Sequence, residues 1–262
     1  MTRDDVPVLL VPVLLVPVLL VTGGSRGIGA AICRSAAAQG WAVAVNYASN
    51  RPAADAVVAA IEADGGMAIA VEGDVGTQAG IDSIFAAVDK AFGRLDGLVN
   101  NAGIVDVPVR IDEITAERLE RMLRINVSGS ILCASAAIRR MSVRHGGKGG
   151  VIVNISSMAA VLGSAGQYID YAASKGAIDT FTVGLAREVV ADGIRVNAVR
   201  PGVIDTDIHA SGGLPDRARD LGPTIPMQRP GTAQEVADAV LYLLSPSSSY
   251  VTGAILNVSG GR

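Results

Sequence analysis

The sequence is poor in the residues that build metal sites and disulfides. It contains two cysteines and two histidines among 262 residues. Cys33 and Cys133 lie far apart in unrelated surroundings, and neither His145 nor His209 stands in a spacing typical of metal ligands. We therefore expect no metal site, and we expect free thiols in a reducing, cytoplasmic compartment.

Aromatic residues are also scarce, at 3%, although half of the sequence is hydrophobic. The core must then be built from alanine, valine, isoleucine and leucine, which suits strands buried on both faces beneath helices. The net charge is −3 and no dense basic block exists, so we expect neither a nucleic acid nor a membrane as partner. A chain of this length fits one large α/β domain.

The N-terminus repeats the pentapeptide VPVLL three times in tandem, from Val6 to Leu20. The apolar run through Val21 has 16 residues, too few to span a membrane, and its prolines would break a helix. It also lacks the basic start and the cleavage site of a signal peptide. The third copy leads into TGGSRGIG and must supply the first strand, which Pro17 opens. We expect residues 1–15 to be a surplus tail, or alternatively an intersubunit or aggregation-prone strand, and residues 16–262 to form a single domain.

Apolar runs alternate with helical patterns along the rest of the chain. The expected strands are 18–21, 42–46, 68–72, 97–99, 150–155, 195–199 and 254–258, and the expected helices are 28–39, 53–63, 78–92, 116–141, 171–191 and 233–244. This alternation predicts an α/β Rossmann fold, a doubly wound, seven-stranded parallel sheet with helices on both faces. Residues 205–229 lack clear periodicity and are the candidate for a mobile substrate lid.

The segment TGGSRGIG joins the first expected strand to the first expected helix. Its glycines Gly23, Gly27 and Gly29 allow a tight turn and let a pyrophosphate approach the backbone, where the helix N-terminus offers free N–H groups. The spacing G-x-x-x-G-x-G differs from the common dinucleotide fingerprint. It resembles the short-chain dehydrogenase/reductase family, in particular members similar to 3-oxoacyl-acyl-carrier-protein reductase and glucose dehydrogenase.

The end of the second expected strand bears on which dinucleotide is bound. In Rossmann folds an acidic residue there holds the ribose 2′-hydroxyl of NAD, but this sequence has Asn46 at that place and no acid nearby. Arg26 lies within the glycine turn, and Ser49 and Arg51 follow the strand, so a 2′-phosphate would meet positive charge. The pattern favours NADP(H), with NAD(H) possible; Arg51 could equally be a solvated surface residue.

Tyr171 and Lys175 form the segment YAASK, in which positions four apart lie on one helical face. A phenol has an ordinary pKa near ~10, and we expect a neighbouring ammonium and an oxidised nicotinamide to lower that pKa. Tyr171 would then exchange a proton with the carbonyl or alcohol oxygen. Tyr168 is a less suitable candidate, because no lysine lies four residues after it.

The resemblance implies a catalytic serine, and two candidates stand side by side. Ser157 lies fourteen residues before Tyr171, one more than is usual in the family, and would polarise the carbonyl oxygen. Ser156 is the alternative. The resemblance further gives Asn126, in RINVSG, the role of kinking a helix and holding a water that relays protons to Lys175, while Lys175 binds the nicotinamide ribose.

The remaining expected cofactor contacts also come from the resemblance. Asp74 and Val75 would hold the adenine, the NNAG segment would line the adenosine ribose, and the turn after the sixth strand would orient the nicotinamide. The complete expected set is Gly23, Ser25, Arg26, Gly27, Ile28, Gly29, Asn46, Ser49, Asp74, Val75, Asn101, Ala102, Gly103, Tyr171, Lys175, Pro201, Gly202, Ile204 and Thr206.

The function that the resemblance implies is hydride transfer between NADP(H) and a carbonyl or secondary alcohol carbon of a small molecule. We expect a reductase of ketones, keto-esters or 3-oxoacyl thioesters. An NAD(P)-dependent sugar or alcohol dehydrogenase and a dinucleotide-sensing protein without turnover are the alternatives. The family also implies a homotetramer, built through the helices at 116–141 and 171–191 and the C-terminal strand.

Overall fold

The computed structural model describes residues 16–262, except the side chain at position 209. The expected surplus tail, residues 1–15, lies outside the described residues. The described residues form one seven-stranded sheet in the order β3-β2-β1-β4-β5-β6-β7, with every pairing parallel. Its strands are β1 (Val18–Val21), β2 (Ala42–Tyr47), β3 (Met67–Glu72), β4 (Gly97–Asn100), β5 (Gly150–Ile155), β6 (Ile194–Pro201) and β7 (Ile255–Val258).

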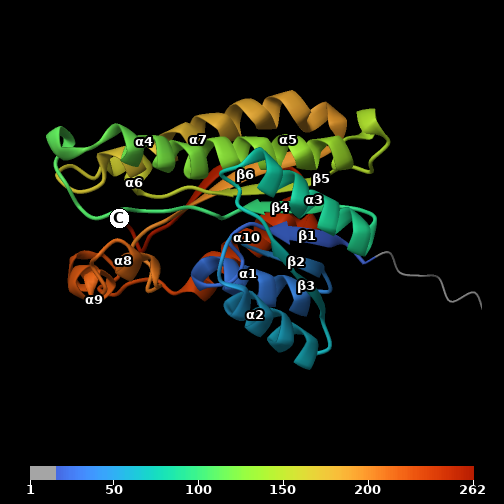
Figure 1. Cartoon of the computed structure of the whole chain (residues 1–262), viewed down its shortest axis with the longest axis horizontal. Helices are drawn as coiled ribbons and strands as arrows, with labels where there is room; N and C mark the ends of the chain where they lie inside the picture. Colours follow the sequence, from blue (N-terminus) through green and yellow to red (C-terminus); the bar gives the residue numbers. More distant parts are fainter. Residues whose placement is uncertain (1–15) are drawn as a thin grey trace, which may run out of the picture.

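Helices cover both faces of this sheet (Figure 1). One face packs against α1 (Gly27–Ala38), α2 (Arg51–Ala63) and α10 (Ala233–Leu244). The other packs against α3 (Gln78–Phe92), α5 (Ser130–Met141) and α7 (Ile169–Val189), and α4 (Ala116–Leu123) lies against α7. Three short helices, α6 (Ala159–Leu162), α8 (Ile208–Ser211) and α9 (Arg217–Leu221), lie at the carboxyl end of the sheet. The doubly wound Rossmann arrangement expected from the sequence is confirmed.

Strand β1 shows how a core of small aliphatic residues serves two layers. Leu19 and Val21 pack into the layer of α1, α2 and α10, whereas Val18 and Leu20 pack into the layer of α3, α5 and α7. All four are buried, as a strand in the centre of a covered parallel sheet requires. Pro17 directly precedes the strand, and its carbonyl accepts a hydrogen bond from Ala42 at 2.9 Å, so its missing N–H costs no sheet bond.

The expected long helix at 116–141 is interrupted. Helix α4 passes into a π-helical turn, Arg124–Gly129, before α5 begins at Ser130. The expected lid is also less irregular than its sequence indicates, since residues 205–229 contain α8 and α9. Both are short, and segments of this length have too few residues to show helical periodicity.

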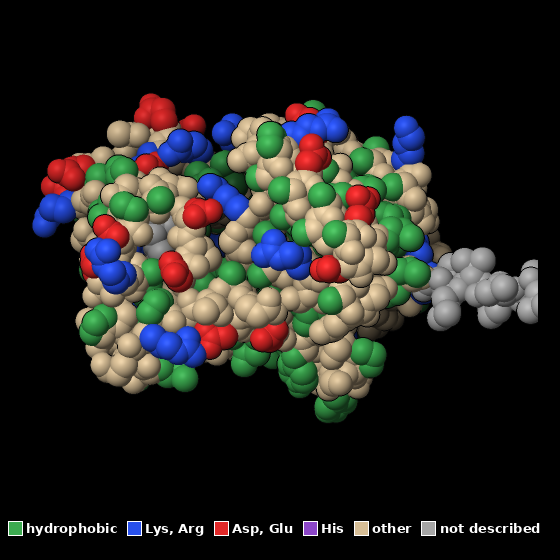
Figure 2. Space-filling model, turned by 90° about the horizontal axis from the view of Figure 1, so that it is seen from below, with side chains coloured by type: hydrophobic (Ala, Val, Ile, Leu, Met, Phe, Trp, Pro, Cys, Tyr) green, Lys and Arg blue, Asp and Glu red, His purple; other side chains and the backbone are tan. Residues whose placement is uncertain are grey.

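The sheet reverses its winding between β1 and β4, which are neighbours although two strands separate them in sequence. In open α/β sheets the crevice at such a reversal, beyond the carboxyl ends of the strands, is where ligands bind. On the face seen in Figure 2, basic and acidic side chains are interspersed and do not form a patch of one sign.

Candidate active site

Side chains from neighbouring strands hold the glycine turn in place. The Asn101 amide nitrogen donates to the carbonyls of Thr22 and Gly23, both at 2.9 Å. From the other side, the Gly23 amide donates to Oδ1 of Asn46 at 3.1 Å. Asn46 Nδ2 in turn donates to the carbonyl of Val71 in β3 at 3.2 Å and to that of Gly73, directly after β3, at 3.0 Å. The turn is therefore fixed from both strands that flank β1.

Two of the turn's glycines are required by geometry. Gly27 has a φ of +51°, a conformation that residues with a side chain rarely adopt. A Cβ atom on Gly29 would lie 2.3 Å from the Gly23 carbonyl oxygen, so no larger residue fits there without moving the turn. Helix α1 begins here with its first N–H groups directed out of the turn, which is the arrangement that binds a pyrophosphate.

A cavity of about 430 Å³, here called the glycine cavity, lies against this turn. Thirteen of the expected cofactor residues line it: Gly23, Ser25, Arg26, Gly27, Ile28, Asn46, Ser49, Asp74, Val75, Asn101, Ala102, Gly103 and Thr206. Gly29 does not line it and acts from behind, by letting α1 approach the turn. Tyr47, Ala48, Asn50, Gly73, Ile104, Ile125, Asp207 and Ile208 also line it, and the sequence motifs do not identify them.

The candidate ligands of a 2′-phosphate do not all lie at the glycine cavity. Arg26 and Ser49 line the glycine cavity, but Arg51 does not. Arg51 instead forms an exposed ion pair with Asp55 at 3.4 Å along α2. The solvated alternative for Arg51 is therefore the one that the geometry favours. Asn46 is buried, and its side-chain amide hydrogen-bonds the glycine turn and the end of β3. It therefore supports the wall of the glycine cavity.

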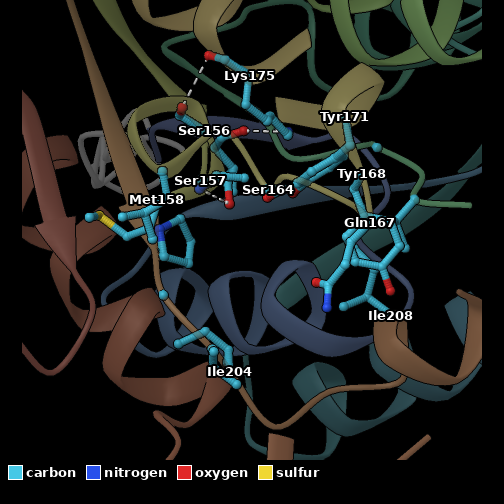
Figure 3. Close-up of a pocket in the computed structure, with 18 of the residues that line it drawn as sticks. Ser156, Ser157, Met158, Ser164, Gln167, Tyr168, Tyr171, Lys175, Ile204 and Ile208 are labelled. Atoms are coloured by element: carbon cyan, nitrogen blue, oxygen red, sulfur yellow. Dashed lines mark hydrogen bonds between the residues drawn. The ribbon is translucent and has the colours of Figure 1, made fainter. Parts of the chain in front are cut away.

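A second cavity, of about 520 Å³, holds the candidate catalytic residues and is here called the tyrosine cavity. Ser157, Tyr171, Lys175, Pro201, Gly202 and Ile204 are among its walls. It shares Ile28, Asn101, Gly103 and Ile208 with the glycine cavity, so the two are continuous. An elongated ligand anchored at the glycine turn can therefore reach Tyr171. Figure 3 shows Tyr171, Tyr168 and Gln167 on one side of the tyrosine cavity and Met158 and Ile204 on the other.

The two serine candidates differ in their partners. Ser156 is 2% exposed, and its hydroxyl donates to the backbone carbonyl of Lys175 at 3.3 Å. Ser157 is partly exposed in the cavity, where its Oγ accepts from the Ala159 amide at 3.1 Å and its hydroxyl lies close enough to Tyr171 to act on the pKa of the phenol. The geometry therefore favours Ser157 as the residue that faces a carbonyl group, in spite of the longer loop between it and the tyrosine.

Lys175 is buried beneath the cavity, and its Nζ donates to the Ile155 carbonyl at 2.7 Å. Burial lowers the pKa of Lys175 from 10.5 to about 8, because the charged form loses its hydration; the carboxylate of Asp179 acts in the opposite direction. The ammonium lies 5.7 Å from the centroid of the Tyr171 ring. It is therefore near the phenol, but its hydrogen bond goes to the backbone.

The expected lowering of the Tyr171 pKa is not found in the protein by itself. Removal from water raises the pKa of the Tyr171 phenol above its ordinary value of 10.0, and the neighbouring Ser157 hydroxyl only partly opposes that rise. Spacing along the sequence reveals the neighbouring ammonium but not burial, and burial disfavours a phenolate more strongly here. At neutral pH Tyr171 is consequently a neutral phenol that still carries its proton.

Asn126 lies in the π-helical turn and is fully buried. Its Oδ1 accepts from the Ile104 amide at 2.8 Å, and its Nδ2 donates to the Ile104 carbonyl at 2.9 Å and to Ser174 at 3.2 Å. A Cβ atom added to Gly103 would meet both Asn126 Oδ1, at 3.4 Å, and Lys175 Nζ, at 3.5 Å. Asn126 thus lies behind the cavity wall, on the far side of Gly103 from bound ligands.

The turn after β6 closes the cavity from below. The Gly202 amide donates to the Val258 carbonyl at 2.9 Å, and a side chain at this position would collide with Ser259, whose Cα lies 2.8 Å from the added Cβ. Ile204 lines the tyrosine cavity and Thr206 lines the glycine cavity, so this segment crosses the junction of the two.

Asp74 caps its own turn by accepting from the Gly76 amide at 2.8 Å.

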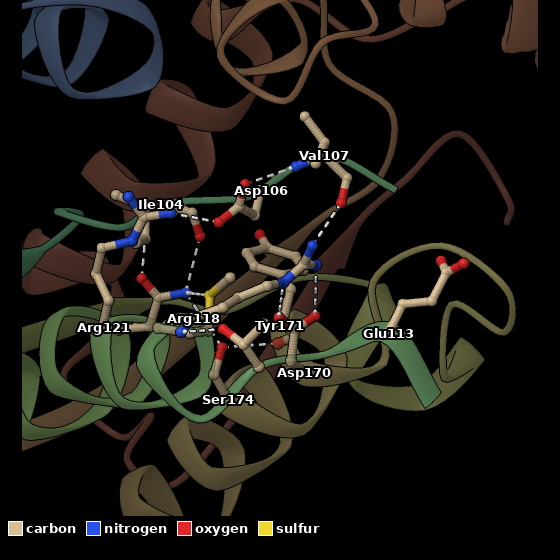
Figure 4. A network of polar contacts seen from close by, with 12 residues as sticks. Ile104, Asp106, Val107, Glu113, Arg118, Arg121, Asp170, Tyr171 and Ser174 are labelled. Atoms are coloured by element: carbon tan, nitrogen blue, oxygen red, sulfur yellow. Dashed lines mark hydrogen bonds and ion pairs between the residues drawn. The ribbon is translucent and has the colours of Figure 1, made fainter. Parts of the chain in front are cut away.

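An ion pair buried beside Tyr171 connects three segments (Figure 4). Asp170 accepts two hydrogen bonds from the Arg118 guanidinium, at 2.7 and 3.2 Å. Arg118 also donates to the carbonyl of Val107, at 2.7 Å. Only 1% of the Asp170 side chain and 10% of the Arg118 side chain are exposed. The pair therefore fastens the start of α7, where Tyr171 lies, to α4 and to the loop after β4.

Several walls of the tyrosine cavity have no motif in the sequence. They include Val105, Met158, Leu162, Ser164, Ala165, Gln167, Tyr168, Val203, Arg217 and Arg262. They come from the loops after β4, β5 and β6 and from the C-terminus. Tyr168, dismissed as a proton carrier, forms part of this wall.

The sheet, the glycine turn and the aligned Ser/Tyr/Lys side chains together define an α/β protein that binds a dinucleotide beside a candidate proton donor. Residues 23–262 match the family model described as "Enoyl-(Acyl carrier protein) reductase". The chain is 50% identical over 242 residues to the uncharacterized oxidoreductase YgfF of Escherichia coli, covering 92% of this chain and 98% of that protein. It is 39% identical over 242 residues to a 3-oxoacyl-[acyl-carrier-protein] reductase of Synechocystis, with coverages of 92% and 94%.

Among solved structures, the chain resembles a short-chain dehydrogenase of Burkholderia cenocepacia in complex with NADP. The TM-score is 0.84 at 39% identity, covering 93% of this chain and 96% of that one. The chain belongs to the short-chain dehydrogenase/reductase family. It is accordingly an oxidoreductase that uses a nicotinamide dinucleotide and acts on a small molecule.

Two other properties concern only the part of the chain that the structure describes. No helix within residues 16–262 combines the length and the apolarity needed to cross a membrane. Within the same residues, no three His, Cys, Asp or Glu side chains are grouped so that they could hold a metal ion.

The lowered pKa of Lys175 predicts how stability depends on pH. Between pH 8 and 10.5 the unfolded chain keeps a proton on this lysine that the folded protein has released, so the free energy of unfolding rises with pH in that window. Relative to Lys175→Met, the wild type should gain up to about 3 kcal/mol from pH 8 to pH 10.5. Urea denaturation of both proteins across this range measures it, and a constant difference would contradict it.

The Arg118–Asp170 pair predicts a loss of stability when one partner is removed. Asp170→Asn leaves Arg118 with an uncompensated, largely buried charge and should lower the free energy of unfolding by about 3 kcal/mol. Asp112→Asn is the matched control, because Asp112 pairs with Arg110 on the surface, where both side chains are more than two-thirds exposed. Its cost should stay below about 1 kcal/mol. Equal costs in chemical denaturation would show that the buried pair contributes no more than a surface pair.

Proposed function

We propose that the protein is an NADP(H)-dependent reductase of ketones or 3-oxoacyl thioesters. The observation that carries this proposal is the position of the Tyr171 phenol, which lies in the wall of the tyrosine cavity together with Ser157. Lys175 lies buried behind it, with its Nζ 5.7 Å from the centroid of the Tyr171 ring. The name of the Synechocystis relative, a 3-oxoacyl-[acyl-carrier-protein] reductase, agrees with this substrate class.

Reduction of a carbonyl requires a hydride at carbon and a proton at oxygen. The reduced nicotinamide, when bound, supplies the hydride. Tyr171 supplies the proton, and its raised pKa keeps that proton in place at neutral pH until negative charge develops on the substrate oxygen. Ser157 donates a hydrogen bond to the same oxygen and stabilises that charge.

Lys175 and Asn126 act from behind Tyr171. With a pKa of about 8, Lys175 is mostly cationic at neutral pH, and its charge favours the phenolate that remains after proton transfer. Asn126 Oδ1 and Lys175 Nζ both lie next to Gly103, and their proximity supports a proton path through Asn126 to the lysine. Such a path would return a proton to Tyr171 after each turnover.

The residues at the glycine cavity support NADP(H) as the preferred cofactor. Arg26 begins α1 and is exposed, so its guanidinium can reach a 2′-phosphate, and Ser49 offers a hydroxyl at the same end. The last residues of β2 are Asn46 and Tyr47, neither of which would repel a phosphate. The NADP bound to the Burkholderia neighbour is consistent with this preference.

A second candidate is the oxidation of an alcohol or sugar by the same residues in reverse. The relative named glucose 1-dehydrogenase 2 of Bacillus subtilis, 38% identical over 241 residues, favours it. Oxidation needs Tyr171 as a base, however, and in the protein without an oxidised nicotinamide its raised pKa favours the phenol over the phenolate. We therefore place reduction first.

We also propose a homotetramer. The outer surface of α4 and α5 leaves Leu119, Leu123, Ile131 and Leu132 between 38% and 40% exposed. A contiguous apolar surface on a soluble domain is typical of an interface. The edge strand β7 is half-covered in the single chain and would form the other contact.

Replacement of the candidate proton donor tests the reaction. Tyr171→Phe should lower kcat for carbonyl reduction by about 10²–10⁴-fold, the usual contribution of a positioned general acid, and leave NADPH binding nearly unchanged. Reduction of a panel of ketones, 3-oxoacyl thioesters and quinones, together with fluorescence titration of NADPH, measures both quantities. Tyr242→Phe, on the exposed side of α10, is the control. A wild-type rate in Tyr171→Phe would show that Tyr171 is not the proton donor.

Replacement of the candidate phosphate ligand tests the cofactor preference. Arg26→Ala should raise the KM for NADPH by about 10- to 100-fold, the value of a charge-assisted hydrogen bond, and change the KM for NADH little. Arg51→Ala, which removes a cation outside the glycine cavity, should affect neither. Equal losses with both cofactors in Arg26→Ala would mean that Arg26 does not recognise the 2′-phosphate.

A further inference from the structure

The tyrosine cavity contains a cation that carbonyl reduction itself does not use. Arg217 opens α9, in the segment after β6, and lines this cavity. Its guanidinium donates to Oε1 of Gln167 at 2.7 Å and lies 5.2 Å from the ring centroid of Tyr168. Gln167 and Tyr168, which Figure 3 shows together on one side of the cavity, directly precede α7. Because Arg217 contacts both, it lies at the side of the cavity where the catalytic helix begins.

The charge around Arg217 is not compensated by the protein. No aspartate or glutamate side chain is among the described residues that line the tyrosine cavity. Within the described part of the chain, no carboxylate lies at ion-pair distance from Arg217, whereas its neighbour Arg219 pairs with both Asp216 and Asp220. Arg262 also lines the cavity and adds a further cation. The cavity therefore has an excess of positive charge from Arg217, Lys175 and Arg262.

The guanidinium is held in place but has donors to spare. Its contacts with Gln167 and the Tyr168 ring use one N–H and one face, and the planar group carries several N–H donors arranged as a fork. A carboxylate can accept two parallel hydrogen bonds from such a fork. A side chain that is already oriented loses less conformational entropy when it binds.

We propose that Arg217 binds a carboxylate on the substrate, so that the preferred substrates are oxo acids rather than neutral ketones. This inference rests on the proposed function, because it places the substrate carbonyl at Tyr171. Tyr168 is the cap residue that precedes α7, whereas Tyr171 lies within the first turn of this helix, so the guanidinium beside Tyr168 lies before the turn that carries the phenol. A carboxylate held beside Tyr168 would lie away from a carbonyl carbon at Tyr171, which favours acids whose ketone lies further along the chain over 2-oxo acids.

Positional isomers of one oxo acid test this directly. The probes are 2-, 4- and 5-oxohexanoic acid and their methyl esters, with the 3-oxo acid omitted because free 3-oxo acids lose carbon dioxide. With NADPH, kcat/KM for the 4- or the 5-oxo acid should exceed that for its ester by about 10- to 100-fold, as expected for a charge-assisted pair. The 2-oxo acid should show no such preference over its ester.

Variants at position 217 assign the preference to the arginine. Arg217→Met should remove the advantage of the acid while keeping kcat/KM for the esters within about threefold of wild type, since the neutral side chain retains apolar contact with Tyr168. Arg217→Lys should restore part of the advantage, because it returns the charge without the fork. Arg219→Met, on the same helix but paired and exposed, should keep the full preference.

The outcomes separate this inference from the function on which it rests. Reduction of the esters with no advantage for any acid, or an equal loss for acid and ester in Arg217→Met, overturns the role of Arg217 and leaves the reductase standing. No turnover of acids, esters and the ketone panel alike overturns the reductase, and this inference with it. An acid preference that is lost in Arg217→Met and partly regained in Arg217→Lys establishes the carboxylate site.

Discussion

The structure depends on how the polar groups at the carboxyl ends of the central strands are satisfied. Where β1, β4 and β2 end, the backbone leaves the sheet and its groups need new partners. Thr22 Oγ1 accepts from the amides of Asn101 and Ala102, at 3.0 Å each, while Asn101 and Asn46 hold the glycine turn from opposite sides. These short polar side chains give the dinucleotide and the substrate a rigid edge to bind against, although they need not touch either one.

Much of this edge could be predicted from the sequence because it depends on local rules. The parallel sheet and the two helical layers follow from alternating apolar runs, and Gly27 and Gly29 follow from turn geometry that only glycine satisfies. Tyr171 and Lys175 follow from helical spacing within a recognisable family pattern. In each case the residues that determine the feature lie within a short stretch of chain. The feature can therefore be predicted without knowledge of the tertiary contacts.

The predictions that failed or stayed open depended on partners remote in sequence. The pKa of Tyr171 rises because of burial, which no spacing reveals, and the competing ammonium of Lys175 hydrogen-bonds the Ile155 carbonyl instead. Arg51 could be separated from Arg26 only once the folded chain showed which of the two lines the glycine cavity, a wall formed by segments remote in sequence. Arg118 and Asp170 are 52 positions apart, and Arg217 meets Gln167 across 50, so neither contact leaves a local pattern. The residues that line the tyrosine cavity also come from segments remote in sequence, so the sequence does not predict which substrate they select.

The π-helical turn at Arg124–Gly129 has a consequence for how the family can vary. One surplus residue in a helix rotates everything on one side of it by about 100° relative to the other. The six residues of this turn, which include Asn126, therefore determine the angle about the helix axis between the outward faces of α4 and α5. Loss of a single residue there would wind the turn into an ordinary helix and swing the Asn126 amide away from Ile104 and Ser174. An insertion or deletion in this stretch would therefore turn α5 relative to α4 and displace Asn126 in a single step.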